Sequence, residues 1–294
     1  DMGATSVISG GSSTVIAANT GFTLSSGATI KTANATGVAG SITDLTKNFS
    51  SAANYEFQGA ATGAFTTTPT ALTVNNFIVN KTTGDVQLGQ SFTVNGNLTM
   101  TSGNLDLNGS NNITLGATAS LQNETSTKLI KNSVAPTATN GFIGTTRSLG
   151  VSPGNVANLG MDISFASAMD ATTIKRFPKI VTSIPTALSS INRVYSIQPS
   201  TASTNSTIIL NYFDGELNGK TESAPSLVTY SSTGTDETVG GSYAFTGVTA
   251  TDATANTVTY NAANLTIANK FWTVLNSDQH YTVQAGDWNT ASTW

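Results

Sequence analysis

The best-placed pair of carboxylates in this chain is Asp214 and Glu216, in the segment YFDGELNG. They flank Gly215 at the expected end of a strand, and with the Asn218 amide they could bind a hard cation. These residues are the candidate calcium site, but calcium needs six to eight oxygen ligands. The twelve-residue helix–loop–helix calcium signature is also absent, so the favoured interpretation is a turn whose acids cap backbone amides, with a bound cation as the alternative. A pair two residues apart cannot place carboxylates across a sugar ring.

Other catalytic side chains are scarce. The chain has one histidine, His280, in a polar segment near its end, and it has no cysteine. A single histidine cannot build a multi-histidine metal site, and we expect it at the surface, as we expect the Asp236–Glu237 turn. The sequence therefore predicts no catalytic residue and no cofactor apart from the calcium candidate.

Four aromatic residues could stack on sugars: Tyr55, Trp272, Trp288 and Trp294. Trp272, in NKFWTVLN, alternates like a residue of a buried strand. Trp288 and Trp294, in GDWNTASTW, are interpreted as packing groups at the start of a solenoid and as contacts between neighbouring modules. A carbohydrate-binding module remains the alternative function, and it requires these aromatics to be exposed in a row or a groove.

These side chains must be positioned by strands, because apolar residues alternate with polar ones through residues 70–122. Members of each apolar pair are two residues apart, which places both on one face of a strand. Gly, Asn, Ser and Thr separate the pairs and favour turns. This pattern predicts a β-solenoid over residues 1–130. The pairs are Leu72/Val74, Phe77/Val79, Val86/Leu88, Phe92/Val94, Leu98/Met100, Leu105/Leu107 and Ile113/Leu115.

Longer and more varied strands follow, so we expect an antiparallel β-sandwich over residues 131–278, of immunoglobulin-like or jelly-roll-like type. Residues 279–294 return to the turn-rich style and are predicted to begin another solenoid module. The fold class is all-β. The expected sandwich strands are Phe142–Arg147, Met161–Phe165, Ile191–Ile197, Thr207–Tyr212, Leu227–Tyr230, Thr257–Tyr260 and Phe271–Val274.

Charge is low throughout, since only 10% of the 294 residues are charged and the net charge is −4. Scattered basic residues make no footprint for nucleic acid. No apolar run approaches the length of a membrane span, so no membrane insertion of this segment is expected. Some β-solenoids are polysaccharide-active enzymes, which cluster acids with basic residues. No such cluster recurs among the acids and lysines of residues 1–130, which makes that function a weaker alternative.

Several blocks together resemble repeats of very large Bacteroidota cell-surface proteins. They include ANYEFQGAATG, residues 71–121, INRVYSIQPSTASTNSTIILNYFDGELNG and AGDWNTASTW, in that order. The resemblance implies export by the type IX secretion route, an extracellular location at the cell surface and a non-catalytic adhesive role. It also implies possible partners among surface glycans or other cells. One departure is the segment STGTDETVGG, where Glu237 stands near the place of the usual aromatic.

The last and first segments of the sequence also follow the block order of the resembling proteins when they are written one after the other. Written end to start, GDWNTASTW precedes DMGATSVISGG and then the first predicted rungs, which is the block order of the resembling proteins. We therefore expect neighbouring copies of the same module to follow head to tail, with Trp288 and Trp294 closing the first rung of the next copy. A solenoid end otherwise exposes unpaired backbone groups.

Overall fold

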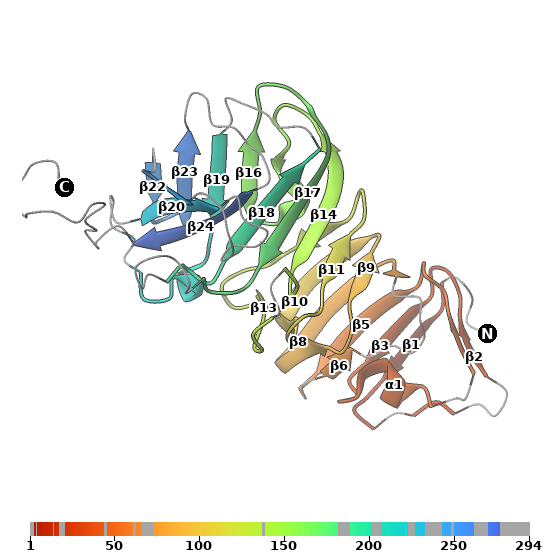
Figure 1. The fold of residues 1–294 in the computed structure, drawn as a ribbon. Helices are drawn as coiled ribbons and strands as arrows, with labels where there is room; N and C mark the ends of the chain where they lie inside the picture. Colours follow the sequence, from red (N-terminus) through yellow and green to blue (C-terminus); the bar gives the residue numbers. More distant parts are fainter. Residues whose placement is uncertain are drawn as a thin grey trace, which may run out of the picture.

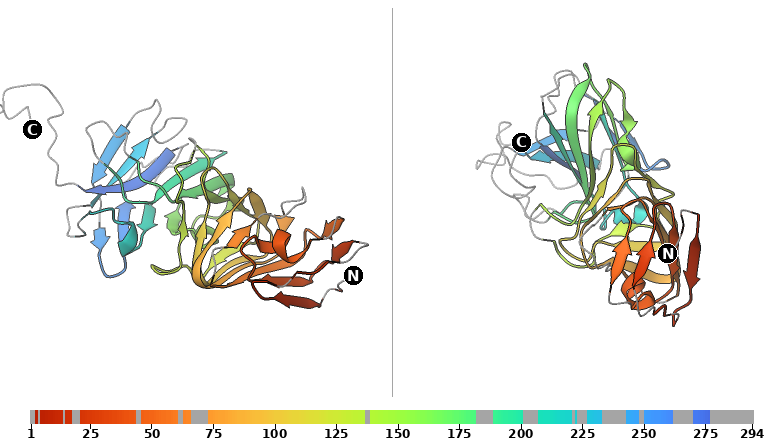
Figure 2. Two further views of the ribbon diagram at one scale, coloured as in Figure 1. Left: turned by 90° about the horizontal axis from the view of Figure 1, so that it is seen from below. Right: turned by 90° about the vertical axis from the view of Figure 1, so that its right-hand side faces the viewer.

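The structure is a computed structural model of the whole chain. It describes residues 3, 5–13, 15–17, 21–43, 46–60, 63–65, 73–136, 139–181, 189–200, 207–220, 222, 227–232, 243–247, 250–261 and 270–276. The molecule is elongated, with a β-solenoid at one end and antiparallel strands at the other (Figures 1 and 2). The predicted all-β class and the solenoid, which has about five turns, are confirmed.

One face of the solenoid is a parallel sheet in which each strand pairs with its counterpart in the next turn. Ile8, Ile30, Tyr55, Phe77 and Leu98 stand opposite one another in successive strands and continue to Leu121. Two shorter strands, β6 and β13, add to β8 and β10. The strands of this sheet are β1 (Val7–Gly10), β3 (Thr29–Thr32), β5 (Asn54–Gly59), β6 (Gly63–Phe65), β8 (Phe77–Leu88), β10 (Asn97–Asp106), β12 (Ser120–Gln122) and β13 (Ile130–Lys131).

A second parallel stack forms another face. β7 (Thr73–Val74), β9 (Phe92–Val94), β11 (Ile113–Leu115) and β14 (Ile143–Leu149) pair in register, and β2 (Phe22–Leu24) pairs with β4 (Lys47–Phe49). The short helix α1 (Gly37–Ser41) precedes β4.

The alternating apolar residues fill the space between these faces. Every described member of the predicted pairs is buried, from Val74 and Phe77 to Ile113 and Leu115. The rings of Phe57 and Phe77 stack at 5.2 Å between centroids, and Phe77 contacts Phe92 at 4.9 Å. Side chains two residues apart face the same way on a strand, which explains why the sequence pattern identified this core.

Asparagines at one corner link successive turns by side-chain hydrogen bonds. The Asn54 amide donates to the Gly27 carbonyl (3.0 Å), and its Oδ1 accepts from the Asn76 amide (2.9 Å). Asn76 Oδ1 accepts from the backbone N–H of Asn97 (2.8 Å), whose own Oδ1 accepts from the Ser120 hydroxyl (3.1 Å). Polar groups that would interrupt the core are thus paired with one another at a turn.

The strand β14 joins the two halves of the molecule. One edge pairs in parallel with β11 of the solenoid, and the other pairs antiparallel with β17 (Met169–Phe177). The expected boundary between residues 130 and 131 falls inside β13, which still stacks on β10. The change from parallel to antiparallel pairing comes at β14, later than the predicted boundary.

Antiparallel strands make up the rest of the described chain, as predicted. The larger sheet continues from β14 through β17 and β18 (Val194–Pro199) to β24 (Lys270–Asn276), β20 (Leu227–Ser232) and β21 (Tyr243–Gly247). A smaller sheet, whose strands are seen in Figure 1, has the order β15-β16-β19-β23-β22. The buried apolar residues of the two sheets belong to one core. The strands of the smaller sheet are β15 (Gly154–Asn155), β16 (Met161–Ser164), β19 (Thr207–Asn211), β23 (Thr257–Asn261) and β22 (Ala250–Asp252).

Several of these strands were not expected from the sequence. The longest is β17, whose residues MDATTIKRF carry charges and threonines. Two 3₁₀ turns, η1 (Val156–Asn158) and η2 (Asp214–Glu216), lie beside strands of the smaller sheet. Unlike an isolated sandwich, this unit shares its larger sheet with the solenoid.

The core assignment predicts a large effect on stability for one residue of β11 and a small effect for its neighbour. Leu115 is 1% exposed, whereas Thr114 points to solvent. Leu115→Ala should lower the free energy of unfolding by about 2–5 kcal/mol, because it leaves a cavity between the sheets. Thr114→Ala, the matched control, should change it by less than about 1 kcal/mol. Urea denaturation measures both, and equal effects would contradict the inward orientation of Leu115.

Candidate functional site at the junction of solenoid and sandwich

A buried ion pair crosses the junction between the two halves. Glu124 lies between β12 and β13 of the last solenoid turn, and Arg176 lies on β17. The guanidinium of Arg176 donates through both terminal nitrogens to the carboxylate of Glu124, each at 2.7 Å. Their side chains are only 2% and 7% exposed. Such bidentate geometry is the strongest form of an arginine–carboxylate contact.

Backbone groups complete the shell of this pair. The Ile130 N–H donates to Glu124 Oε1 at 2.9 Å, and Arg176 Nη1 donates to the Leu159 carbonyl at 3.1 Å. Removing one member of a buried pair leaves an uncompensated charge, which costs about 3–5 kcal/mol. The junction therefore depends on both residues being present.

A second buried ion pair, between Arg193 on β18 and Glu216 in η2, lies close to the first. Arg193 Nε and Nη2 donate to Glu216 Oε1 at 3.0 and 2.9 Å, and its guanidinium lies over the Phe213 ring at 4.9 Å. Arg193 Nη1 donates to the Tyr195 hydroxyl at 3.3 Å. That hydroxyl in turn donates to the Gly160 carbonyl at 2.8 Å, so the network ties β18 of the larger sheet to the smaller sheet.

These contacts determine where the predicted calcium ligands lie. Glu216 is buried against Arg193, and its Oε2 accepts from the Phe213 N–H at 2.9 Å. This contact has the form of the favoured interpretation, in which an acid caps a backbone amide. Asp214 Oδ1 accepts from the Asn256 amide at 2.7 Å, and the Asn218 amide donates to the Ser190 carbonyl at 3.0 Å.

The three predicted ligands therefore have three separate partners. A cation at Glu216 would lie beside the Arg193 guanidinium, which repels it. Within the described residues, no group of three acidic, histidine or cysteine side chains is arranged to hold a metal ion. Calcium binding at Asp214 and Glu216 stays a prediction that this geometry does not favour.

The electrostatics of the junction favour the charged forms. Burial alone would raise the pKa of Glu124, but the charges of Arg176 and Arg193, with hydrogen bonds from Arg176 and Ile130, lower it below its ordinary value. Burial raises the pKa of the Tyr195 hydroxyl, so it stays neutral and donates its hydrogen bonds.

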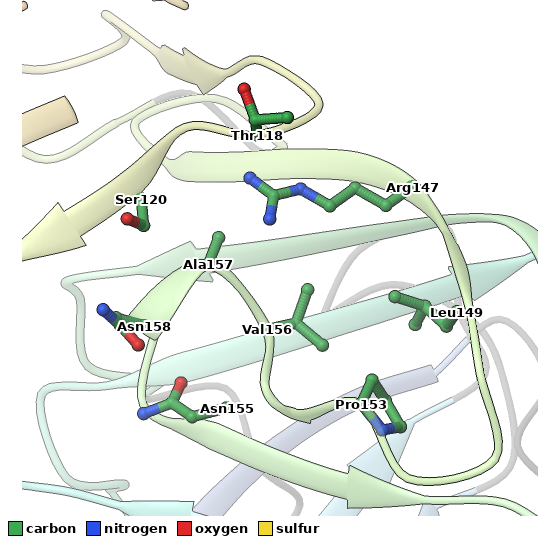
Figure 3. A pocket seen from close by; sticks show the side chains of 9 residues that line it. All are labelled: Thr118, Ser120, Arg147, Leu149, Pro153, Asn155, Val156, Ala157 and Asn158. Carbon is green, nitrogen blue, oxygen red and sulfur yellow. The ribbon is translucent and has the colours of Figure 1, made fainter. Parts of the chain in front are cut away.

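Two cavities open beside this network. One, of about 260 Å³, is lined by Glu124, Arg193 and Phe213 among others. The larger, of about 390 Å³, lies between the last solenoid turns and η1 (Figure 3). Its lining residues are Thr118, Ser120, Arg147, Leu149, Pro153, Asn155, Val156, Ala157 and Asn158.

The predicted sugar-stacking aromatics do not form a platform in the described chain. Tyr55 is 2% exposed and belongs to the solenoid core, so it is not a surface residue. Trp272 lies on β24 opposite Tyr195, in a strand as predicted. Trp288, Trp294, His280 and the Asp236–Glu237 turn lie outside the described residues. The large apolar side chains exposed in the described part are Val7, Val15, Val134, Val151 and Ile180, none of them aromatic.

Sequence reasoning missed the arginines that build this junction. All three arginines of the chain, Arg147, Arg176 and Arg193, fall within 47 positions, and residues 1–146 contain none. Arginine is favoured over lysine in buried ion pairs because its guanidinium is planar and less strongly hydrated. The appearance of arginine after residue 146, in addition to the lysines that continue along the chain, was the available signal.

Comparisons with known proteins leave the family open. The chain matches no protein-family model, and neither the curated proteins nor the solved structures contain a match. Within the described residues, no helix has the length and apolar character needed to span a membrane.

The Glu124–Arg176 pair predicts a specific acid sensitivity. Because the folded-state pKa of Glu124 is lowered, its contribution to stability is present above the pKa of the unfolded state, about 4.3, and is lost as pH falls through the folded-state pKa. Glu124→Gln should destabilise the protein by about 3 kcal/mol at pH 7. It should also reduce the loss of stability between neutral and acidic pH.

Asp170→Asn is the matched control, since it removes an exposed carboxylate on the same strand as Arg176. Denaturant unfolding across the pH range measures both variants. A Glu124→Gln protein with the wild-type pH dependence would contradict the prediction.

Proposed function

We propose that this chain is a non-catalytic structural and adhesive module of a large extracellular bacterial surface protein, acting as a stiff spacer. The sheet that continues through β14 from the solenoid into the antiparallel unit is the observation that carries this proposal. Force applied along the chain axis would pass through paired strands. The resemblance of the sequence blocks to Bacteroidota adhesin repeats supports the extracellular location.

The buried ion pairs support the same function. Glu124 and Arg176 belong to different halves of the chain, and their bidentate contact fixes the relative orientation of these halves. A buried ion pair often stabilises a protein less than apolar residues of similar volume would. It can, however, specify a single orientation of the segments that it joins. A stiff spacer needs a defined orientation of its two halves. An enzyme would also need a side chain or cofactor that takes part in a reaction.

Spin-label distances test the stiffness. The chain has no cysteine, so Asn48→Cys and Ala253→Cys place one label in the solenoid and one in the antiparallel unit. Both residues are exposed. A second pair within the solenoid, Asn48→Cys and Thr114→Cys, gives the width that label motion alone produces. We expect equally narrow distance distributions for both pairs. A broad or multimodal distribution for the first pair alone would contradict a rigid spacer.

We further propose that copies follow one another head to tail, so that the turns of the solenoid continue from one copy into the next. Successive paired residues of the first solenoid sheet are 21 to 25 positions apart, as from Phe77 to Leu98 or from Ile30 to Tyr55. A strand supplied by the preceding copy would add one more turn to this stack.

The open edge of β1 gives this arrangement a physical reason. In the described chain β1 pairs only with β3, so its other edge presents unpaired backbone groups. The segment Tyr281–Thr282–Val283 has the apolar alternation of the solenoid strands. It would add a strand to β1 of the next copy, and Trp288 and Trp294 would then lie within the added turn.

A protein of two directly joined copies tests this proposal with an internal control. Tyr281→Asp with Val283→Asp in the first copy should lower the melting temperature, because the added strand would bury two charges. The same double substitution in the second copy, which no copy follows, should leave the melting temperature nearly unchanged. Equal effects in both positions would contradict strand addition across the join.

A further inference from the structure

We propose that the cavity between β14 and η1 is a binding site for a carboxylate-bearing sugar, such as a hexuronate unit of an acidic polysaccharide. This site is independent of the spacer function and involves none of the aromatics considered for sugar stacking. Among the described residues that line the cavity, Arg147 alone is charged (Figure 3).

Arg147 occupies a position where an apolar residue would be expected. It alternates along β14 with Thr145 and Leu149, both of which are buried, while Thr146 and Ser148 face solvent. Its guanidinium is therefore directed to the inner side of the sheet. Figure 3 shows it extending from β14 to a place between Thr118 and Ala157.

Neutral acceptors fix the orientation of this guanidinium. Arg147 Nε donates to the Thr145 hydroxyl oxygen at 3.0 Å, and Nη2 donates to the Gly116 carbonyl at 2.8 Å and to the Ala119 carbonyl. The Thr145 hydroxyl itself donates to the Leu115 carbonyl at 2.9 Å. These contacts hold the group in place without neutralising its charge.

No carboxylate pairs with Arg147 in the described part of the chain, whereas Arg176 and Arg193 each have one. Arg147 is partly shielded from water, and burial lowers its pKa, which indicates that its charge is incompletely solvated. An anion entering the cavity would therefore gain a charge-assisted hydrogen bond at a pre-oriented donor.

The remaining walls suit a sugar better than a phosphate. Thr118 and Ser120 supply hydroxyls and Asn155 and Asn158 supply amides, so neutral polar groups surround a single positive charge. Leu149, Pro153 and Val156 supply the apolar part of the lining, which can contact the C–H face of a ring. The volume of about 390 Å³ lies in the range of small-ligand pockets. A monoanion with several hydroxyls fits this combination.

The backbone of the facing wall is held in an unusual conformation. Ala157 and Asn158 have φ of +55° and +56°, in the left-handed region that disfavours a residue such as alanine. Hydrogen bonds maintain it: the Asn158 amide donates to the Leu121 carbonyl at 3.0 Å, and Asn155 Oδ1 accepts from the Gly160 N–H at 2.8 Å. Strain of this kind is concentrated at binding sites. It forms the wall opposite Arg147.

Titration of the isotope-labelled protein with sodium glucuronate, observed by NMR, tests the proposal, and glucose is the neutral comparison. We expect saturable shifts of amide signals from β14 and residues 155–158 with glucuronate, and much weaker ones with glucose. Sodium acetate and sodium phosphate distinguish a sugar site from a general anion site. Equal or tighter binding of phosphate, binding of acetate as tight as that of glucuronate, or no saturable shift with glucuronate would overturn the proposal.

Two variants at Thr118 separate charge from folding. Thr118 is exposed and its side chain makes no hydrogen bond in the described structure, so Thr118→Gln and Thr118→Glu differ only in the charge added beside Arg147. Thr118→Glu should weaken glucuronate binding at least about tenfold relative to Thr118→Gln. Equal affinities for these two variants would contradict a role for the Arg147 charge.

Arg147→Gln should abolish binding, and its melting temperature shows whether the fold is kept. Lys47→Gln removes a positive charge at the far end of the solenoid and should leave the affinity unchanged. A loss of binding in Lys47→Gln as large as in Arg147→Gln would mean that net charge, and not the cavity, attracts the sugar.

Discussion

The structure depends on the two hydrogen-bonded edges of β14. A solenoid grown turn by turn always ends on a strand whose outer edge is unpaired, and an unpaired edge invites association with other chains. Here β17 runs antiparallel along that edge and pairs with it from Ile143 to Leu149. The antiparallel unit therefore caps the solenoid, and the solenoid in turn extends the larger sheet of that unit. Each half completes the hydrogen bonding of the other.

Buried charge fixes the angle at which the halves meet. Two ion pairs, Glu124–Arg176 and Arg193–Glu216, lie within one network that includes the Tyr195 hydroxyl. Apolar packing tolerates small rotations between layers, whereas bidentate contacts at 2.7 Å do not. The network also includes one of the acids that suggested a metal site, because Glu216 compensates the charge of Arg193 inside the protein.

The same junction creates the cavity that Arg147 lines. The turn η1 lies against the last solenoid turns and leaves a cavity of about 390 Å³, whose lining includes Arg147 and Val156. A site at this place can be rigid, because strands carry one wall and a hydrogen-bonded turn carries the other. A spacer that is one module among many could thus bind acidic polysaccharide at each repeat, and weak individual contacts would add along the array.

The sequence by itself determined the periodic part of this protein. Apolar pairs such as Phe92/Val94 and Ile113/Leu115 are buried as predicted, since strand geometry alone decides which residues share a face. It also indicated antiparallel strands in the second half, where β19 and β23 closely match the expected ranges. These features are local, so a few neighbouring residues carry the information.

Only the tertiary structure decided what joins the halves. Glu124 and Arg176 are 52 positions apart, and nothing in the local pattern marks either as a partner of the other. The strand β17 was missed because its charges and threonines look like those of a loop, although Arg176 is among the most buried residues of the chain. The Arg147 cavity likewise exists only because η1 folds back over the solenoid. Burial and charge pairing depend on contacts between distant segments, and the sequence pattern records only neighbours.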